Sequence, residues 1–147
     1  MIEEIDNRVK LHIGAGKRDF GKGWVNIDAE QLPHIHHHNV LELPFEDNSV
    51  DLIYTSHLLE YFDKNEVGAI LKEWRRVLKV GGVLRLAVPN FEPIAKLYVE
   101  QNLMLENFLG LLYGAMDCNG QKIYHKTVYD FRSLRFLLKH NGFWRCY

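Results

Sequence analysis

The 147-residue chain lacks most features that mark secreted, membrane-spanning or nucleic-acid-binding proteins. Its two cysteines, Cys118 and Cys146, form no Cys-x-x-Cys motif, so we expect reduced thiols in a cytoplasmic protein. No apolar run approaches the roughly 20 residues of a membrane span, and the acidic N-terminus lacks the apolar core of a signal peptide. A formal net charge of −1 does not indicate a nucleic-acid or membrane partner. The length predicts a single domain over residues 1–147.

Short apolar runs alternate with turn residues through the first half of the chain, which indicates strands. A helix is predicted after Asp63, an N-cap residue, because apolar residues then recur at spacings of three and four as far as Leu78. A strand, this helix and another strand form a βαβ unit, so we expect a parallel sheet. The predicted strands are Val9–Ile13, Trp24–Ile27, His38–Leu41, Val50–Thr55 and Val83–Val88.

The second half predicts helices separated by a loop. Helical character extends from Ile94 to about Met116, where Gly110 and Gly114 suggest a bend. The last part of the chain predicts a loop at Asp117–Thr127, a helix capped by Asp130 and ending at Leu138, and the start of a strand at Phe143–Tyr147.

Two glycine-containing segments predict a nucleotide site. Leu11–Gly16 is an apolar strand that leads into a Gly-x-Gly turn, and Gly23–Asp28 is a second short strand that ends on a carboxylate. Glycines let the backbone come close to a ligand, and a carboxylate accepts hydrogen bonds from both hydroxyls of a ribose. A plain strand-ending turn is the alternative for the glycines, as a surface carboxylate is for Asp28.

Two longer motifs resemble a known family. The segment Asp51-Leu-Ile-Tyr-Thr-Ser-His-Leu-Leu-Glu-Tyr-Phe62 resembles the fourth-strand motif of class I S-adenosylmethionine-dependent methyltransferases, and residues 71–89 resemble the helix and fifth strand that follow. The resemblance implies an α/β fold with a Rossmann-like, doubly wound, mostly parallel sheet. It also implies S-adenosyl-L-methionine as cofactor. Here the N-terminal half has room for few helices, and no residues remain for the family's seventh strand.

The resemblance also implies residue roles, carried over by position. The implied cofactor-binding residues are Gly14, Ala15 and Gly16 beneath the methionine part, Asp28 at the ribose hydroxyls, Asn39 and Val40 beside the adenine, and Ser56 and His57 at the methionine or the acceptor. The oxygen of the Asn39 side chain could accept a bond from the adenine amino group.

A general base is needed only if the acceptor loses a proton during methyl transfer. His57 and His125 are the candidates, because histidine exchanges protons near neutral pH. Each could instead be a structural histidine. We therefore expect a methyltransferase that acts on a small-molecule acceptor, such as a sugar or another metabolite. The alternatives are a non-catalytic cofactor-binding or regulatory module and, with less support from the glycine spacing, a dinucleotide-dependent oxidoreductase.

The histidines of residues 34–38 raise the question of a metal site. Successive residues of a strand point to opposite faces, and no cysteine or well-spaced carboxylate completes a zinc site, so we expect no metal. The absent seventh strand would leave a sheet edge open, which predicts a homodimer.

Overall fold

The computed structural model describes residues 7–146, so the acidic N-terminus and Tyr147 lie outside the described residues. The chain forms two compact units. We call the first the sheet unit; it comprises Met1–Ser56 and Glu73–Leu86. We call the second the helical unit; it comprises His57–Lys72 and Ala87–Tyr147.

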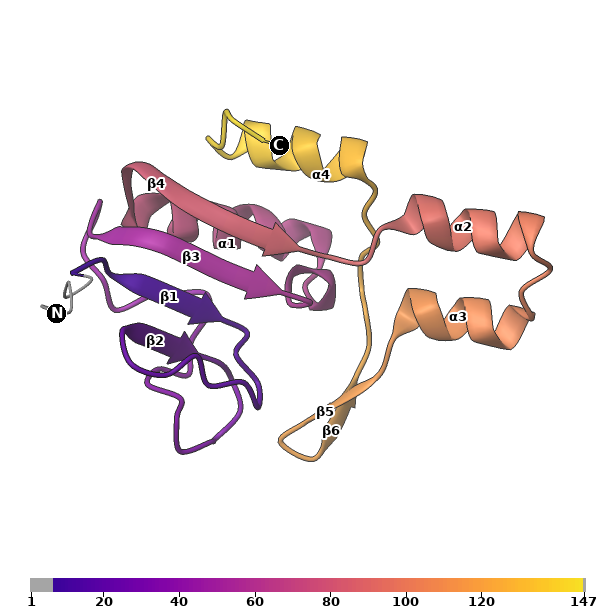
Figure 1. Cartoon of the computed structure of the whole chain (residues 1–147), viewed down its shortest axis with the longest axis horizontal. Coiled ribbons are helices and arrows are strands. Elements are labelled where there is room, and N and C mark those ends of the chain that lie inside the picture. Colours follow the sequence, from indigo (N-terminus) through magenta and orange to yellow (C-terminus); the bar gives the residue numbers. More distant parts are fainter. Residues whose placement is uncertain (1–6, 147) are drawn as a thin grey trace, which may run out of the picture. The chain divides into compact units, whose positions relative to one another are not determined.

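The sheet unit is built on four strands in the order β2-β1-β3-β4. β1 pairs in parallel with both β2 and β3, and the four arrows of Figure 1 point the same way. This sheet confirms the predicted α/β fold with a mostly parallel sheet. The strands are β1 (Lys10–Ile13), β2 (Trp24–Ile27), β3 (Val50–Ser56) and β4 (Leu78–Ala87), and helix α1 (Lys64–Val77) connects β3 to β4.

Apolar burial explains why these residues form these elements. Leu11, Ile13, Ile27 and Ile53 on β1, β2 and β3 are completely buried. Along α1 the predicted apolar stripe is buried as well, since one helix face recurs every three to four residues. The buried residues of α1 are Val67, Ile70, Leu71, Trp74 and Val77.

The prediction of a strand at His38–Leu41 is wrong. That segment contains no strand, and its neighbour His37 makes an isolated parallel bridge to Ile27. The physical reason lies at Asn39, whose side-chain oxygen accepts hydrogen bonds from the N–H groups of Leu41 and Glu42 and so forms a turn. This turn uses backbone N–H groups that would otherwise form the hydrogen bonds of a strand.

The helical unit begins with a 3₁₀ turn, η1 (Leu59–Tyr61), and the first part of α1. The long helix predicted up to Met116 is two helices, α2 (Phe91–Glu100) and α3 (Leu105–Tyr113). The break falls where Asn102 adopts a positive φ of 48°, and not at Gly110. The loop predicted at residues 117–127 contains part of a hairpin of β5 (Met116–Cys118) and β6 (Gln121–Ile123), closed by Asn119 and Gly120 with positive φ angles.

The last helix, α4 (Phe131–His140), begins as predicted at Asp130, which forms a capping box with Ser133. The strand predicted from Phe143 is absent over residues 143–146. None of the helices in the described part of the chain has the length and apolar character that a membrane crossing requires.

Candidate functional site

The turn after β1 leaves room for a ligand. Gly14 and Gly16 have φ angles of 75° and 50°, values at which a side chain would be strained. The N–H groups of Gly14 and Ala15 donate to the carbonyl of Ile27 at 2.8 and 3.3 Å, which fixes the turn to the end of β2. A Cβ atom added at Gly16 would meet no protein atom within 4 Å, so a ligand could approach this backbone closely.

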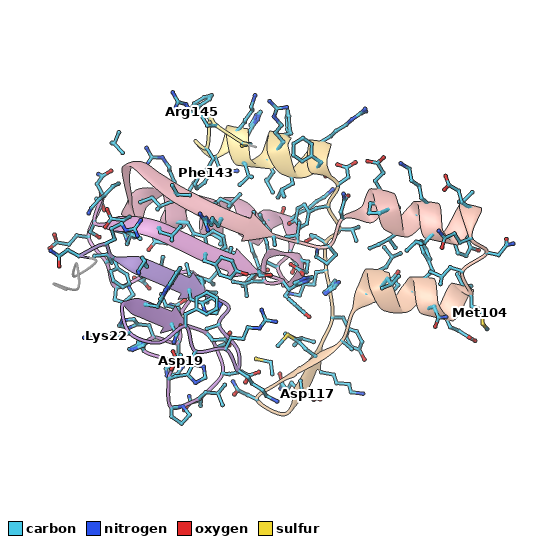
Figure 2. The ribbon with its side chains drawn as sticks, viewed as in Figure 1. Asp19, Lys22, Met104, Asp117, Phe143 and Arg145 are labelled. Atoms are coloured by element: carbon cyan, nitrogen blue, oxygen red, sulfur yellow. The ribbon has the colours of Figure 1, made fainter. Side chains whose placement is uncertain are left out.

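The loop from this turn to β2 contains no helix, in agreement with the short spacing in the sequence. Figure 2 labels Asp19 and Lys22 on this loop. Asp19 Oδ1 accepts hydrogen bonds from Gly21 N and from the side-chain amide of Asn26, both at 2.8 Å. These bonds lower the pKa of the Asp19 carboxyl, and they hold the loop closed without a helix.

Asp28 joins the ends of β1 and β2. Its Oδ2 accepts from Gly16 N and its Oδ1 from Glu30 N, both at 2.8 Å. The side chain is half-buried, and a carboxylate oxygen has a second lone pair. Asp28 therefore fixes the glycine turn and can still accept hydrogen bonds from a ligand.

Two histidines that follow β2 form hydrogen bonds with the backbone at Gly16 and Asp28. His34 Nε2 donates to the carbonyl of Gly16 at 2.8 Å, and His38 Nδ1 donates to the carbonyl of Asp28 at 3.2 Å. His36 Nδ1 accepts from Asn26 N at 3.0 Å. In residues 7–146, no group of three or more His, Cys, Asp or Glu side chains is arranged to hold a metal ion. These hydrogen bonds give His34, His36 and His38 a structural role.

The other residues implied for the cofactor, Asn39, Val40 and Ser56, also lie in the sheet unit. The side-chain oxygen of Asn39 already accepts two backbone N–H bonds, so its exposed amide group, a donor, is what it can offer a ligand. Val40 is buried. Ser56 is half-buried at the end of β3, the strand beside β1.

His57, the next residue, begins the helical unit in a strained conformation. Its φ is +55°, which is uncommon for a residue other than glycine, although histidine adopts it more readily than most. Its N–H donates to the carbonyl of Ala87 at 3.0 Å, and its side chain is 64% exposed. Its Nδ1 lies 3.1 Å from Oε1 of Glu60.

Glu60 is a buried carboxyl that the sequence reasoning missed. Its side chain is 1% exposed, and Oε2 has no hydrogen-bond partner among the described residues. Burial raises the pKa of this carboxyl, against the opposing effect of His57 and His125. Spacing offered a signal, since an acid three residues after a histidine lies within reach of its ring in a helical turn.

His125 approaches the same carboxylate from a distant part of the sequence. Its Nε2 lies 3.9 Å from Oε1 of Glu60, and its Nδ1 donates to the carbonyl of Leu112 at 2.9 Å. The ring packs edge-on against Tyr61, with 4.9 Å between centroids. The two histidines predicted from the sequence thus share one buried carboxyl, and we call His57, Glu60 and His125 the Glu60 cluster.

A cavity of about 400 Å³ lies in the helical unit and is bordered by His125. One of its two lysines, Lys126, pairs with Asp63 at 3.1 Å. Its lining combines aromatic and basic side chains: Tyr61, Lys122, Ile123, Tyr124, His125 and Lys126.

Known proteins resemble this chain in sequence and in fold. Residues 15–86 match the family model described as a methyltransferase domain. A demethylmenaquinone methyltransferase from Staphylococcus haemolyticus is 27% identical over 142 residues, which cover 85% of this chain and 56% of the relative. The chain thus spans little more than half the length of that curated relative.

Two solved structures share the fold at low sequence identity. An S-adenosylmethionine-dependent methyltransferase from Archaeoglobus fulgidus gives a TM-score of 0.64 at 19% identity, covering 92% of this chain and 60% of that one. One from Methanosarcina mazei gives 0.61 at 23%, covering 90% and 77%. The match over residues 15–86 and the shared folds confirm the predicted resemblance to class I S-adenosylmethionine-dependent methyltransferases.

Proposed function

We propose that this chain binds S-adenosylmethionine through its sheet unit and methylates a hydroxyl or amine of a small molecule, such as a sugar or another metabolite. The observation that carries the proposal is the pair formed by Asp28 and the glycine turn. It places a half-buried carboxylate and open backbone at the carboxyl edge of a parallel sheet, within the segment that matches the family.

The residues of the sheet unit fit the cofactor. The open space at Gly16 admits the methionine part, Asp28 retains lone pairs for two ribose hydroxyls, and the amide of Asn39 can donate to a ring nitrogen of adenine. Val40 and Ser56 complete the proposed binding residues, with His57 next to Ser56 in the chain. When bound, the cofactor supplies a methyl group on a positively charged sulfur, so the protein mainly orients the reactants.

His57 is the proposed base. Its exposed ring can take a proton from the attacking group of the acceptor, whereas the His125 ring is nine-tenths buried and is held by the Leu112 carbonyl. A base at this point contributes roughly 10²- to 10⁴-fold to the rate when the acceptor must lose a proton.

A second candidate is a non-catalytic S-adenosylmethionine-binding module that acts through a partner. It is favoured by β4, which stands at one edge of the sheet. An open edge pairs readily with another chain, so a homodimer through β4 remains a prediction. Light scattering at high protein concentration tests it, and a strictly monomeric protein would contradict it.

Turnover separates the two candidates. Wild type and His57→Asn would be incubated with S-adenosylmethionine and a panel of sugars, polyols and amines, and S-adenosylhomocysteine release measured. Asparagine tolerates the positive φ of residue 57 better than alanine does. We expect one acceptor class to be methylated and the variant to lose about 100-fold in rate. No release with any acceptor would favour the binding module.

A further inference from the structure

We propose that Glu60 is a positioning residue, which fixes the tautomer and orientation of His57 and thereby makes Nε2 of His57 the atom that takes the acceptor's proton. This inference rests on the proposed function, in which His57 is the base. It adds a residue and a reacting atom to that proposal.

The hydrogen bond between His57 and Glu60 defines the tautomer. Oε1 of Glu60 lies 3.1 Å from Nδ1 of His57. When Glu60 is ionised, its carboxylate can only accept, so the neutral ring carries its proton on Nδ1 and donates that hydrogen bond. The lone pair is then on Nε2, at the far side of the ring. Because 64% of the His57 side chain is exposed, Nε2 is available to an acceptor while Glu60 stays buried.

His125 supplies the other side of the cluster. Its Nδ1 must be protonated, because the Leu112 carbonyl can only accept. In the neutral ring the lone pair is then on Nε2, which lies 3.9 Å from Oε1 of Glu60. Tyr61 and Tyr129 are the further ionisable groups affected by the charge of Glu60.

The backbone of Glu60 has a separate structural role. Its carbonyl accepts from the N–H groups of Lys126 and Thr127 at 2.7 and 3.1 Å, which holds the segment containing His125. A side-chain substitution leaves these two bonds in place. A fully structural explanation of the buried carboxyl is less satisfactory, since an apolar residue would avoid leaving Oε2 without a partner.

The proposed reaction is a one-step displacement. The X–H bond of the acceptor breaks and its proton forms an N–H bond at Nε2 of His57. The electron pair left on X forms the bond to the methyl carbon, and the pair of the broken carbon–sulfur bond stays on sulfur. His57 then carries a positive charge, which the Glu60 carboxylate stabilises through the Nδ1 hydrogen bond.

The test reads the protonated nitrogen directly. Nitrogen-15 NMR of histidine-labelled protein distinguishes Nδ1–H from Nε2–H in wild type, Glu60→Gln, Glu60→Ala and the exposed control Glu106→Gln. We expect wild-type His57 to be protonated on Nδ1, Glu60→Ala to shift the proton mainly to Nε2, and the control to match wild type. Glu60→Gln keeps the shape of the side chain but removes its charge, and its NH₂ group can donate to Nδ1. If the alanine variant does not fold, a smaller Nδ1–H fraction in Glu60→Gln than in wild type is the expected result.

Calorimetric titration with S-adenosylmethionine, run on the same samples, separates the two proposals. Binding by all four proteins within about a factor of 3, the range of a neutral substitution, is expected if Glu60 acts on His57 and not on the cofactor. Binding together with an Nε2–H tautomer in wild-type His57, or with no change in Glu60→Ala, overturns the role of Glu60 alone. Absence of binding by wild type overturns the proposed function, and the role of Glu60 in proton transfer with it.

Discussion

The sheet unit and the helical unit are stabilised in different ways. Strands β1 to β3 bury apolar residues completely, whereas no described residue of α2, α3 or α4 is buried. Among the described residues of the helical unit, complete apolar burial is confined to the first segment, at Leu59 and the first part of α1. Its later part shows polar contacts, such as the pair of Lys126 with Asp63 and the capping box at Asp130. Apolar packing therefore holds the strands that carry the proposed cofactor residues, while a buried polar cluster holds the proposed acid–base residues.

The largest expected effect is a difference in the free energy of unfolding between a variant of α1 and a variant of α4. Trp74→Ala removes a completely buried ring from α1 and should lower the free energy of unfolding by about 3–5 kcal/mol. Phe136→Ala on α4 removes a ring that is 66% exposed and should change it by less than about 0.5 kcal/mol. Denaturant titrations of both variants measure the two values. Equal losses would show that Phe136 on α4 is packed as tightly as Trp74 on α1.

A glycine pair tests how the Glu60 cluster is held. At Gly114 the φ is +49°, and an added Cβ would lie 2.5 Å from Nε2 of His125, so Gly114→Ala should displace the ring and cost about 1–3 kcal/mol. Gly110→Ala on the open side of α3 should instead stabilise by about 0.5–1 kcal/mol. Thermal unfolding compares the two, and a neutral Gly114→Ala would mean that His125 is free to move.

The third prediction concerns pH and the cost of burying Glu60. Because burial raises the pKa of this carboxyl, the folded protein binds its proton more tightly than the unfolded chain does. Its contribution to stability is therefore lost as pH rises from the ordinary glutamate range through the raised folded pKa. Glu60→Gln cannot ionise, so it should gain stability relative to wild type as pH rises.

Denaturant titrations at several pH values between 4 and 8, with Glu106→Gln as the exposed control, measure this difference. A gap between wild type and Glu60→Gln that widens toward acid would contradict it. A variant that is more stable yet changes the state of His57 would identify Glu60 as a functional residue retained at a cost in stability.

The smallest expected effect lies in the histidine segment. His34→Ala removes the donor to the Gly16 carbonyl, a hydrogen bond that contributes about 0.5–1.5 kcal/mol. If this bond shapes the cofactor turn, the Kd for S-adenosylmethionine should rise about 3- to 10-fold. His140→Ala, on the exposed surface of α4, is the control. Equal affinities in the two variants would restrict His34 to a structural role.

The apolar pattern predicted most of the sheet unit, because its strands are short apolar runs between turn residues and α1 buries helically spaced apolar residues. β2 was predicted to the residue and α1 within a residue or two. The strand at 38–41 failed because an Asn39 side-chain turn competes with strand pairing. The split between α2 and α3 was missed for a related reason: Asn102 in the left-handed region ends the helix without a glycine or proline signal.

The two proposed sites also differ in how far the sequence predicts them. The glycines and Asp28 lie close in sequence and follow a recognisable order, so their proximity could be predicted. His57 and His125 were also named from the sequence, but their common partner was not. Glu60 joins them only because the chain returns at Lys126 and Thr127 to bond its carbonyl, a long-range contact that no local pattern encodes.

The central claim is that the sheet unit holds the cofactor while His57 serves the acceptor. Calorimetric titration of S-adenosylmethionine into wild type, Asp28→Ala and His57→Asn tests it most directly. We predict binding by wild type, a loss of about 100-fold in Asp28→Ala because two hydrogen bonds to a charged group are removed, and near-unchanged binding in His57→Asn. Binding that survives in Asp28→Ala, or that is lost equally in His57→Asn, would contradict the account.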